Sequence, residues 1–135
     1  MFSGGEPTLQ RALLPAMRTV RSLGFGVGLH TGGAYPGLLA QALPEADWVG
    51  LDIKAAPDDY DLVTGRPNSA ATAWRSLQLV LGNRELRAGT DRPLEVEVRT
   101  TVHPAAIDDA RLRTLGCRLA DAGVDHWAVQ RFRGA

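Results

Sequence analysis

The stretch DWVGLDI, residues 47–53, has the mostly apolar composition of a strand that a parallel sheet buries on both faces. Comparable segments lie on either side of it along the chain: FGVGLHT at 25–31, LEVEVRTTV at 94–102 and HWAVQRF at 126–132. Residues 1–2 add a strand stub at the start. Five strands joined by helical crossovers predict an α/β fold with a parallel sheet, either open or curved into a barrel.

Helices are predicted between these strands from the spacing of apolar residues and from the residues at the helix ends. The polar segment 84–93 is the best candidate for an exposed loop. The predicted helices span 14–23, 35–43, 68–81 and 107–122, with a short helical turn at 57–65.

The chain of 135 residues has the length of one domain, and we expect residues 1–135 to form it. Its 15 basic and 15 acidic residues give a formal net charge of zero, which indicates no basic surface for nucleic acid. No apolar stretch reaches the roughly 18 residues of a membrane span, and the N-terminus lacks the pattern of a signal peptide. We therefore expect no nucleic acid and no membrane as partners, and a cytoplasmic location.

The single cysteine, Cys117, excludes an internal disulfide and any cysteine-rich metal site made by this chain alone. It stands beside Gly116 in the predicted helix 107–122, near Leu115. This position favours a buried thiol that packs as a small apolar group. No metal-binding residues are predicted.

The segment FSGGEPTLQ, residues 2–10, follows the strand stub, and parallel α/β proteins bind ligands beyond the carboxyl ends of their strands. Gly4 and Gly5 allow the backbone to approach a ligand closely. Glu6 can offer a carboxylate to an ammonium group, and Pro7 turns the chain toward the next element. We interpret these residues as a binding turn, and an ordinary polar turn is the alternative.

Two pairs of charged residues lie on predicted strands. Asp52 and Lys54 are two residues apart, so their side chains share one face, and we favour a site role over a mutual salt bridge. Glu97 and Arg99 repeat this spacing, and there the two interpretations carry equal weight. His30 is expected to be a hydrogen-bonded structural histidine rather than a ligand.

Four segments, taken in order, resemble one group within the radical S-adenosylmethionine superfamily. The nearest resemblance is to the anaerobic ribonucleoside-triphosphate reductase activating proteins, and VQRFR at 129–133 is similar to that group's final strand. The segments are FSGGEPTLQ (2–10), GFGVGLHTGG (24–33), DWVGLDIKAAPDDYDLVTG (47–65) and VRTTVHP (98–104).

The resemblance implies a partial (β/α)6 barrel that lacks its first βα unit, with strands two to six present. In the family, a [4Fe-4S] cluster on a three-cysteine loop reduces S-adenosylmethionine, and the resulting 5′-deoxyadenosyl radical takes a hydrogen atom from a glycine of the partner. The implied cofactor is therefore S-adenosylmethionine, and the implied partner is an anaerobic ribonucleoside-triphosphate reductase. The implied cofactor-binding residues are Gly4, Gly5, Glu6, Pro7, Thr31, Asp52, Lys54 and Arg99.

Two departures from the family pattern limit what the resemblance implies. The CxxxCxxC cluster loop belongs upstream of GGEP, and this sequence has no such segment. We therefore expect either further sequence upstream or a separate chain that carries the loop. HTGG at 30–33 stands where the family usually reads Asp-Thr-Asn-Gly, so His30 cannot make the contacts of that carboxylate.

Three functions stay open on the sequence. The first is the larger part of a glycyl-radical activating enzyme of the kind described above. The second is a non-catalytic remnant that binds a partner protein or a nucleotide-like ligand. The third is another small radical enzyme such as a 7-carboxy-7-deazaguanine synthase, against which the RTTV and VQRFR segments argue.

Overall fold

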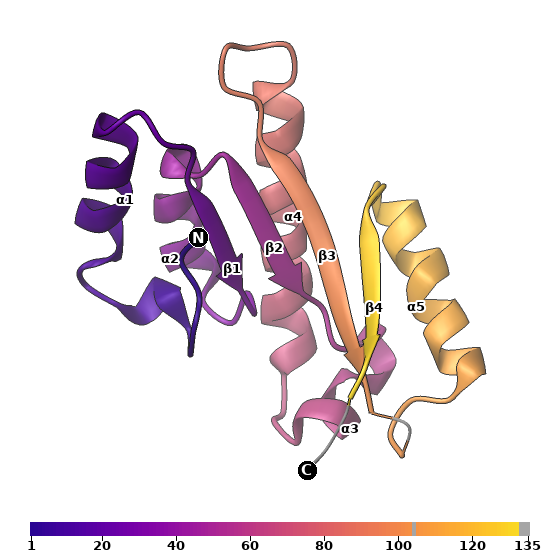
Figure 1. Cartoon of the computed structure of the whole chain (residues 1–135). Coiled ribbons are helices and arrows are strands. Elements are labelled where there is room, and N and C mark those ends of the chain that lie inside the picture. Colours follow the sequence, from indigo (N-terminus) through magenta and orange to yellow (C-terminus); the bar gives the residue numbers. More distant parts are fainter. Residues whose placement is uncertain (104, 133–135) are drawn as a thin grey trace.

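The parallel α/β sheet predicted from the sequence is confirmed. The computed structural model describes residues 1–103 and 105–132. Within them, four parallel strands form one sheet in the order β1-β2-β3-β4, which is also their order along the chain (Figure 1). The strands span Gly28–Thr31 (β1), Trp48–Asp52 (β2), Glu95–Val102 (β3) and Trp127–Arg131 (β4).

The predicted strand stub lies beside β1. Phe2 forms a parallel bridge with Leu29, and its N–H donates to the carbonyl of Gly28 at 2.7 Å. The N–H of His30 in turn donates to the carbonyl of Phe2 at 2.9 Å. The turn that follows Phe2 is thereby attached to the outer edge of β1.

Helices connect the strands, as the sequence predicts, and α2 and α4 lie behind the sheet in Figure 1. Three short 3-10 helices stand at Pro7–Leu9 (η1), Leu43–Glu45 (η2) and Pro57–Asp59 (η3). The α-helices span Leu13–Ser22 (α1), Pro36–Ala42 (α2), Tyr60–Thr64 (α3), Ser69–Arg87 (α4) and Asp109–Ala122 (α5).

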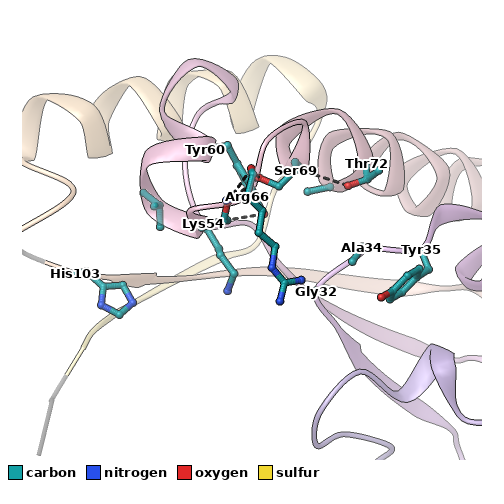
Figure 2. Close-up of a pocket in the computed structure, with 12 residues that line it drawn as sticks. Gly32, Ala34, Tyr35, Lys54, Tyr60, Arg66, Ser69, Thr72 and His103 are labelled. Carbon is teal, nitrogen blue, oxygen red and sulfur yellow. Dashed lines mark hydrogen bonds between the residues drawn. The ribbon is translucent and has the colours of Figure 1, made fainter.

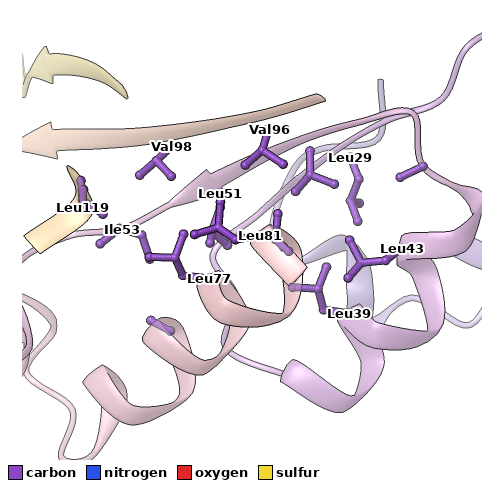
Figure 3. Packing of buried hydrophobic residues seen from close by; sticks show 14 of the residues in the cluster. Leu29, Leu39, Leu43, Leu51, Ile53, Leu77, Leu81, Val96, Val98 and Leu119 are labelled. Carbon is purple, nitrogen blue, oxygen red and sulfur yellow. The ribbon is translucent and has the colours of Figure 1, made fainter. Parts of the chain in front are cut away.

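The hydrophobic core lies between the sheet and helices α2 and α4. Strand side chains alternate between the two faces of a sheet, and on β1, β2 and β3 one face is buried against helix residues such as Leu39 and Leu77 (Figure 3). Burying one leucine side chain contributes roughly 1.5–3 kcal/mol. The apolar strand residues buried on this face are Leu29, Val49, Leu51, Val96, Val98 and Val102.

The other face of the sheet carries polar and aromatic side chains that are only partly buried. We call it the open face and define it by His30, Trp48, Asp52, Glu97 and Arg99. Alternation along β2 and β3 places these residues opposite the core. The open face is therefore the side of the sheet on which a ligand can meet charged groups.

Helix α4 is longer than the sequence predicts, and the loop predicted at 84–93 is wrong over residues 84–87. Tertiary hydrogen bonds hold its last turn. Arg84 donates to the carbonyl of Gly123 at 2.8 Å, and Arg87 donates to the carbonyls of Arg92 and Leu43 at 2.7 and 3.1 Å. Gly123 and Leu43 lie 39 and 44 residues away in the sequence, so no local pattern indicates these two bonds.

Strand β1 is shorter than predicted and begins at Gly28 rather than at Phe25. The N–H of Val27 donates to the Asp47 carboxylate at 2.8 Å instead of joining the strand ladder. Phe25 is 67% exposed and contributes nothing to the core. The side chain of Asp47 therefore decides where this strand begins.

Asp47 also makes the fold sensitive to acid. Burial raises its pKa, but hydrogen bonds from Val27 and Arg92 outweigh burial and hold that pKa below its ordinary value. A carboxylate whose pKa is lower in the folded state stabilises the fold above its unfolded pKa of about 3.9 and ceases to do so as the pH falls through the folded value.

We expect Asp47→Asn to lower the free energy of unfolding by about 1 kcal/mol at pH 7, since the amide has one acceptor oxygen for the two donors, Val27 and Arg92, at a partly exposed position. The deficit should shrink as the pH falls below about 4. Urea unfolding of both proteins between pH 3 and 7 measures this. A deficit that is the same at every pH would contradict the role of the charge.

Candidate functional site

The turn between Phe2 and η1 holds the two glycines in a backbone conformation that favours glycine. Gly4 has φ of 88° and Gly5 has φ of 57°, both in the left-handed region. A Cβ built on either residue meets no heavy atom within 4 Å. The space in front of the turn is therefore open, as close approach of a ligand to the backbone requires.

The Glu6 carboxylate ties this turn to the end of β1. It accepts hydrogen bonds from the N–H and hydroxyl of Thr8, from the Thr31 hydroxyl at 2.8 and 2.9 Å, and from the Gly32 N–H at 3.0 Å. Pro7 opens η1 directly behind it and is buried. A carboxylate has about four lone-pair sites, so these protein donors saturate it.

Thr31 is a buried link in this arrangement rather than an exposed binding group. Its hydroxyl donates to Glu6 and accepts the N–H of Gly33 at 3.2 Å. The ammonium contact expected of Glu6 stays a prediction, but both residues already hold the turn in place. Two segments 25 residues apart in the sequence are joined by this one carboxylate.

Asp52 and Lys54 form the salt bridge that was the alternative to a site role. Lys54 Nζ lies 2.8 Å from Asp52 Oδ2. The other carboxylate oxygen, Oδ1, is buried and has no hydrogen-bond partner in the described part of the chain. Buried polar atoms are normally hydrogen-bonded, so Oδ1 remains able to accept a bond from a ligand.

The backbone just after β2 is held by Tyr60. Its hydroxyl accepts the N–H of Lys54 at 3.3 Å. Burial raises the pKa of Tyr60 to about 12, so the phenol is neutral at ordinary pH. The position of Lys54 is thus set on one side by Asp52 and on the other by a buried tyrosine.

Arg99 lies beside Asp52, its register partner on the neighbouring strand. Its Nε donates to Glu97 Oε1 at 3.1 Å, and its guanidinium carbon lies 5.4 Å from the centre of the Trp48 ring. This geometry allows a cation–π interaction. One predicted charge pair therefore lies at the end of β2 and the other on β3, and Asp52 and Arg99 are neighbours on the open face.

His30 differs from the prediction of a hydrogen-bonded structural histidine. Its Nε2 is buried and has no hydrogen-bond partner within residues 1–103 and 105–132. The ring lies against Gly50, where the Trp48 ring also packs: an added Cβ would be 3.1 Å from His30 Cδ2 and 2.5 Å from the Trp48 ring. Only glycine at position 50 leaves room for both rings.

The residues do not fit an iron–sulfur cluster. Cys117 is exposed on α5, which corrects the expectation of a buried thiol. Such a cluster requires several cysteine thiolates, and the sequence contains one. No group of three or more histidine, cysteine, aspartate or glutamate side chains gathers in the described residues. We therefore assign no chemical step to a cluster held by this chain.

A cavity of about 600 Å³ lies at the carboxyl ends of the strands, and sequence reasoning missed most of it. Lys54 lines it, as do Arg66 and His103. Arg66 follows α3 in a loop without any recognised motif, and His103 was given no function. Their only signal in the sequence is that each follows a predicted element at the ligand-binding edge of the sheet.

Comparison with models of known protein families gives no match. Among curated proteins, a 7-carboxy-7-deazaguanine synthase of Thermococcus kodakarensis is 41% identical over 54 residues, which are 39% of this chain and 21% of that protein. The match thus spans about a fifth of the length of that relative. What that enzyme does therefore enters only as a proposal.

A solved structure resembles the whole fold. It is a domain of pyruvate-formate lyase-activating enzyme from Bacteroides vulgatus, with a TM-score of 0.55, 14% identity, and coverage of 95% of this chain and 96% of that chain. At 14% identity the likeness shows the fold alone, and it agrees with the partial barrel implied by the sequence.

One further observation concerns membranes. Within residues 1–103 and 105–132, no helix has both the length and the apolar character that a membrane crossing requires.

Proposed function

We propose that this chain is the larger part of a radical S-adenosylmethionine domain that acts, with a cluster supplied by another segment or chain, as an activating protein for anaerobic ribonucleoside-triphosphate reductase. One observation carries the proposal. The open Gly4-Gly5 turn is joined through Glu6 to the end of β1, next to an open face on which Asp52 and Arg99 are neighbours.

The residues fit S-adenosylmethionine as a ligand. The cofactor carries an ammonium group, a carboxylate and ribose hydroxyls, and the open face offers partners for each kind of group. Asp52 Oδ1 and His30 Nε2 are buried polar atoms without a partner among the described residues. Lys54 and Arg99 are cations at the same edge. With an electron from an iron–sulfur cluster held elsewhere, bound S-adenosylmethionine would be cleaved to methionine and would supply the 5′-deoxyadenosyl radical for hydrogen-atom abstraction.

In this proposal, Gly4 and Gly5 present backbone groups to the cofactor, and Glu6 keeps their turn in place while its negative charge attracts the ammonium group. Asp52 accepts a hydrogen bond through Oδ1. Lys54 donates to the other oxygen of Asp52, Oδ2. This bond holds the carboxylate in one orientation and leaves Oδ1 as the acceptor for the cofactor. His30 stands where the family pattern has a carboxylate, and it offers an imidazole ring instead.

A second candidate function has a specific observation in its favour. The 54-residue match to a 7-carboxy-7-deazaguanine synthase favours a small-molecule substrate over a protein glycine. The RTTV segment on β3 and the VQRFR segment at 129–133 favour the activating protein. Titration with purified anaerobic ribonucleoside-triphosphate reductase, and separately with the substrate of the synthase, distinguishes the two. Binding of neither would favour the non-catalytic alternative.

We expect the chain to bind S-adenosylmethionine with a dissociation constant near the millimolar range, about −4 kcal/mol, because no cluster iron anchors the cofactor. Gly5→Ala should weaken binding at least fivefold, since it strains the turn and fills the open space before it. Isothermal titration measures both constants.

Gly89→Ala is the matched control. Gly89 also has a positive φ, of 74°, and open space around its Cβ position, but it lies in the loop after α4, far along the chain from the turn. Gly89→Ala should lower the free energy of unfolding about as much as Gly5→Ala does, and it should leave the affinity for S-adenosylmethionine unchanged. Equal affinity of wild type and Gly5→Ala for S-adenosylmethionine would show that the Gly4-Gly5 turn is not part of the binding site.

A further inference from the structure

The cavity at the carboxyl ends of the strands is large enough for a small organic molecule. Its volume of about 600 Å³ lies within the 300–1,000 Å³ typical of ligand pockets. The loop after β1 contributes Tyr35, the segment between β2 and α4 contributes Lys54 and Arg66, and His103 follows β3. Four separate segments of the chain thus meet around one space, since the first turn of α4 completes it.

The side chains that line this cavity include a lysine (Lys54), an arginine (Arg66) and a histidine (His103), and no carboxylate. Figure 2 shows the side chains of Lys54 and Arg66 extending in the same direction, between His103 and Tyr35 in this view. A cavity lined by positive side chains attracts anions. The attraction is stronger where the cavity walls have a low dielectric constant.

Three acidic residues of the neighbouring segments do not line the cavity, although two of them contact side chains that do. Asp52 pairs with Lys54 at 2.8 Å, Asp59 lies 3.8 Å from Arg111, and Asp61 accepts a hydrogen bond from Ser69 at 3.3 Å. The charge of Lys54 is therefore partly neutralised. Arg66 remains the strongest uncompensated charge.

Arg66 is held in place by its backbone and not by its guanidinium. Its N–H donates to the Thr64 hydroxyl at 3.1 Å, and its carbonyl accepts from the Ser69 hydroxyl at 2.9 Å. Within the described residues its side chain forms no hydrogen bond and no ion pair. A guanidinium that is placed at a cavity but has no protein partner is suited to bidentate binding of a carboxylate or phosphate.

The first turn of α4 adds to the positive potential. This helix has 19 residues, and its first turn lines the cavity through Ser69, Thr72 and Ala73. Asn68 at its N-cap has φ of 62° and its side chain caps no backbone N–H. The exposed N–H groups and the helix dipole favour a negative group at this end.

We propose that this cavity binds the carboxylate or phosphate group of a small organic anion, with Arg66 as the principal ligand and Lys54 and His103 beside it. The assignment does not require the proposed S-adenosylmethionine site, because it rests on the cavity, its charges and the uncapped helix. Tyr35 stands at the other side of the cavity and offers an aromatic surface to the rest of such a molecule.

Two probes test the proposal without knowledge of the natural ligand: sodium tripolyphosphate for phosphate chemistry and citrate for carboxylate chemistry. Both are titrated into the whole chain at constant ionic strength, because screening alone changes the stability of charged surfaces. Wild type should bind at least one probe. The probe that binds more tightly identifies which of the two groups the cavity prefers.

Arg66→Gln should weaken that binding at least tenfold, whereas Arg75→Gln should leave it unchanged. Arg75 is an exposed arginine on α4, the helix whose first turn lines the cavity, but its own side chain does not line it, so it is a matched control for net charge. Neither side chain supports the core, and equal melting temperatures would verify that both variants fold.

The proposal is overturned if wild type binds neither probe, or if the two variants bind the probe equally. Because S-adenosylmethionine takes no part in the titration, failure here leaves the proposed function standing, and failure of cofactor binding leaves this cavity standing.

Discussion

Gly33→Ala is expected to lower the free energy of unfolding by roughly 2–5 kcal/mol, a large share of the about 5–15 kcal/mol that stabilises a typical domain. Gly33 has φ of 70°, and a side chain in this left-handed conformation costs about 1–2 kcal/mol. The residue is also buried. An added Cβ would lie 2.8 Å from the Ser76 Cβ and 3.0 Å from Leu51 Cδ1, and such overpacking costs about 1–3 kcal/mol more.

The loop that carries Gly33 cannot easily move away from α4 to make room for an added Cβ. Its carbonyl accepts the Ser76 hydroxyl at 2.7 Å, so α4 is bonded directly to the loop after β1. Moving the loop to make room for a methyl group would break this buried hydrogen bond. Thermal unfolding followed by circular dichroism should show a drop in Tm of roughly 10 °C or more.

Gly37→Ala is the control. Gly37 lies in α2 with no heavy atom within 4 Å of its Cβ position, and it has no positive φ. Alanine favours helix over glycine by up to about 1 kcal/mol, so this variant should be as stable as wild type or slightly more so. If Gly33→Ala and Gly37→Ala had the same Tm, the close packing of Gly33 against α4 described above would be contradicted.

Glu6→Gln is expected to lower the free energy of unfolding by about 2–4 kcal/mol, because the amide keeps only one acceptor oxygen where the carboxylate receives bonds from four donor groups. The amide NH2 would face N–H or O–H donors of Thr8, Thr31 or Gly32. Urea unfolding measures the loss.

Hydrogen exchange gives a local readout of the same substitution. The amide of Gly32 donates to Glu6 Oε1 at 3.0 Å, so it should exchange faster in Glu6→Gln. Glu85→Gln is the matched control: the Glu85 side chain is 72% exposed and its pair with Arg84 is worth about 0–1 kcal/mol. Unchanged exchange at Gly32 would show that Glu6 does not hold the turn.

The role of Glu6 also bears on cofactor binding. Glu6→Gln should weaken binding of S-adenosylmethionine whether the carboxylate touches the ammonium group or only positions the turn. Equal binding by wild type and this variant would show that Glu6 does neither. Gly5→Ala is the cleaner probe of the turn, because it leaves every hydrogen bond of the carboxylate in place.

Much of the fold could be predicted because its signals are local. A buried strand such as DWVGLDI is mostly apolar, and LEVEVRTTV alternates residue by residue, so each indicates its environment in its own sequence. The alternation on β3 also showed that Glu97 and Arg99 share a face, which the hydrogen bond between them confirms. The ends of α4 and β1 could not be predicted in this way, since Arg87 and Asp47 act through partners distant in sequence.

The sequence by itself determined the order of strands and helices, the buried faces, and the glycine turn before η1, because spacing and backbone preference act over a few residues. Only the tertiary structure decided that Glu6 is saturated by Thr8, Thr31 and Gly32, that Asp52 keeps one oxygen without a partner, and that Arg66 reaches the cavity beside Lys54. Each of these three features depends on segments that are far apart in the sequence. The parallel pairing of the strands brings those segments together. Long-range pairing, hydrogen-bond saturation and cavity charge are properties of that assembly, so no short stretch of sequence specifies them.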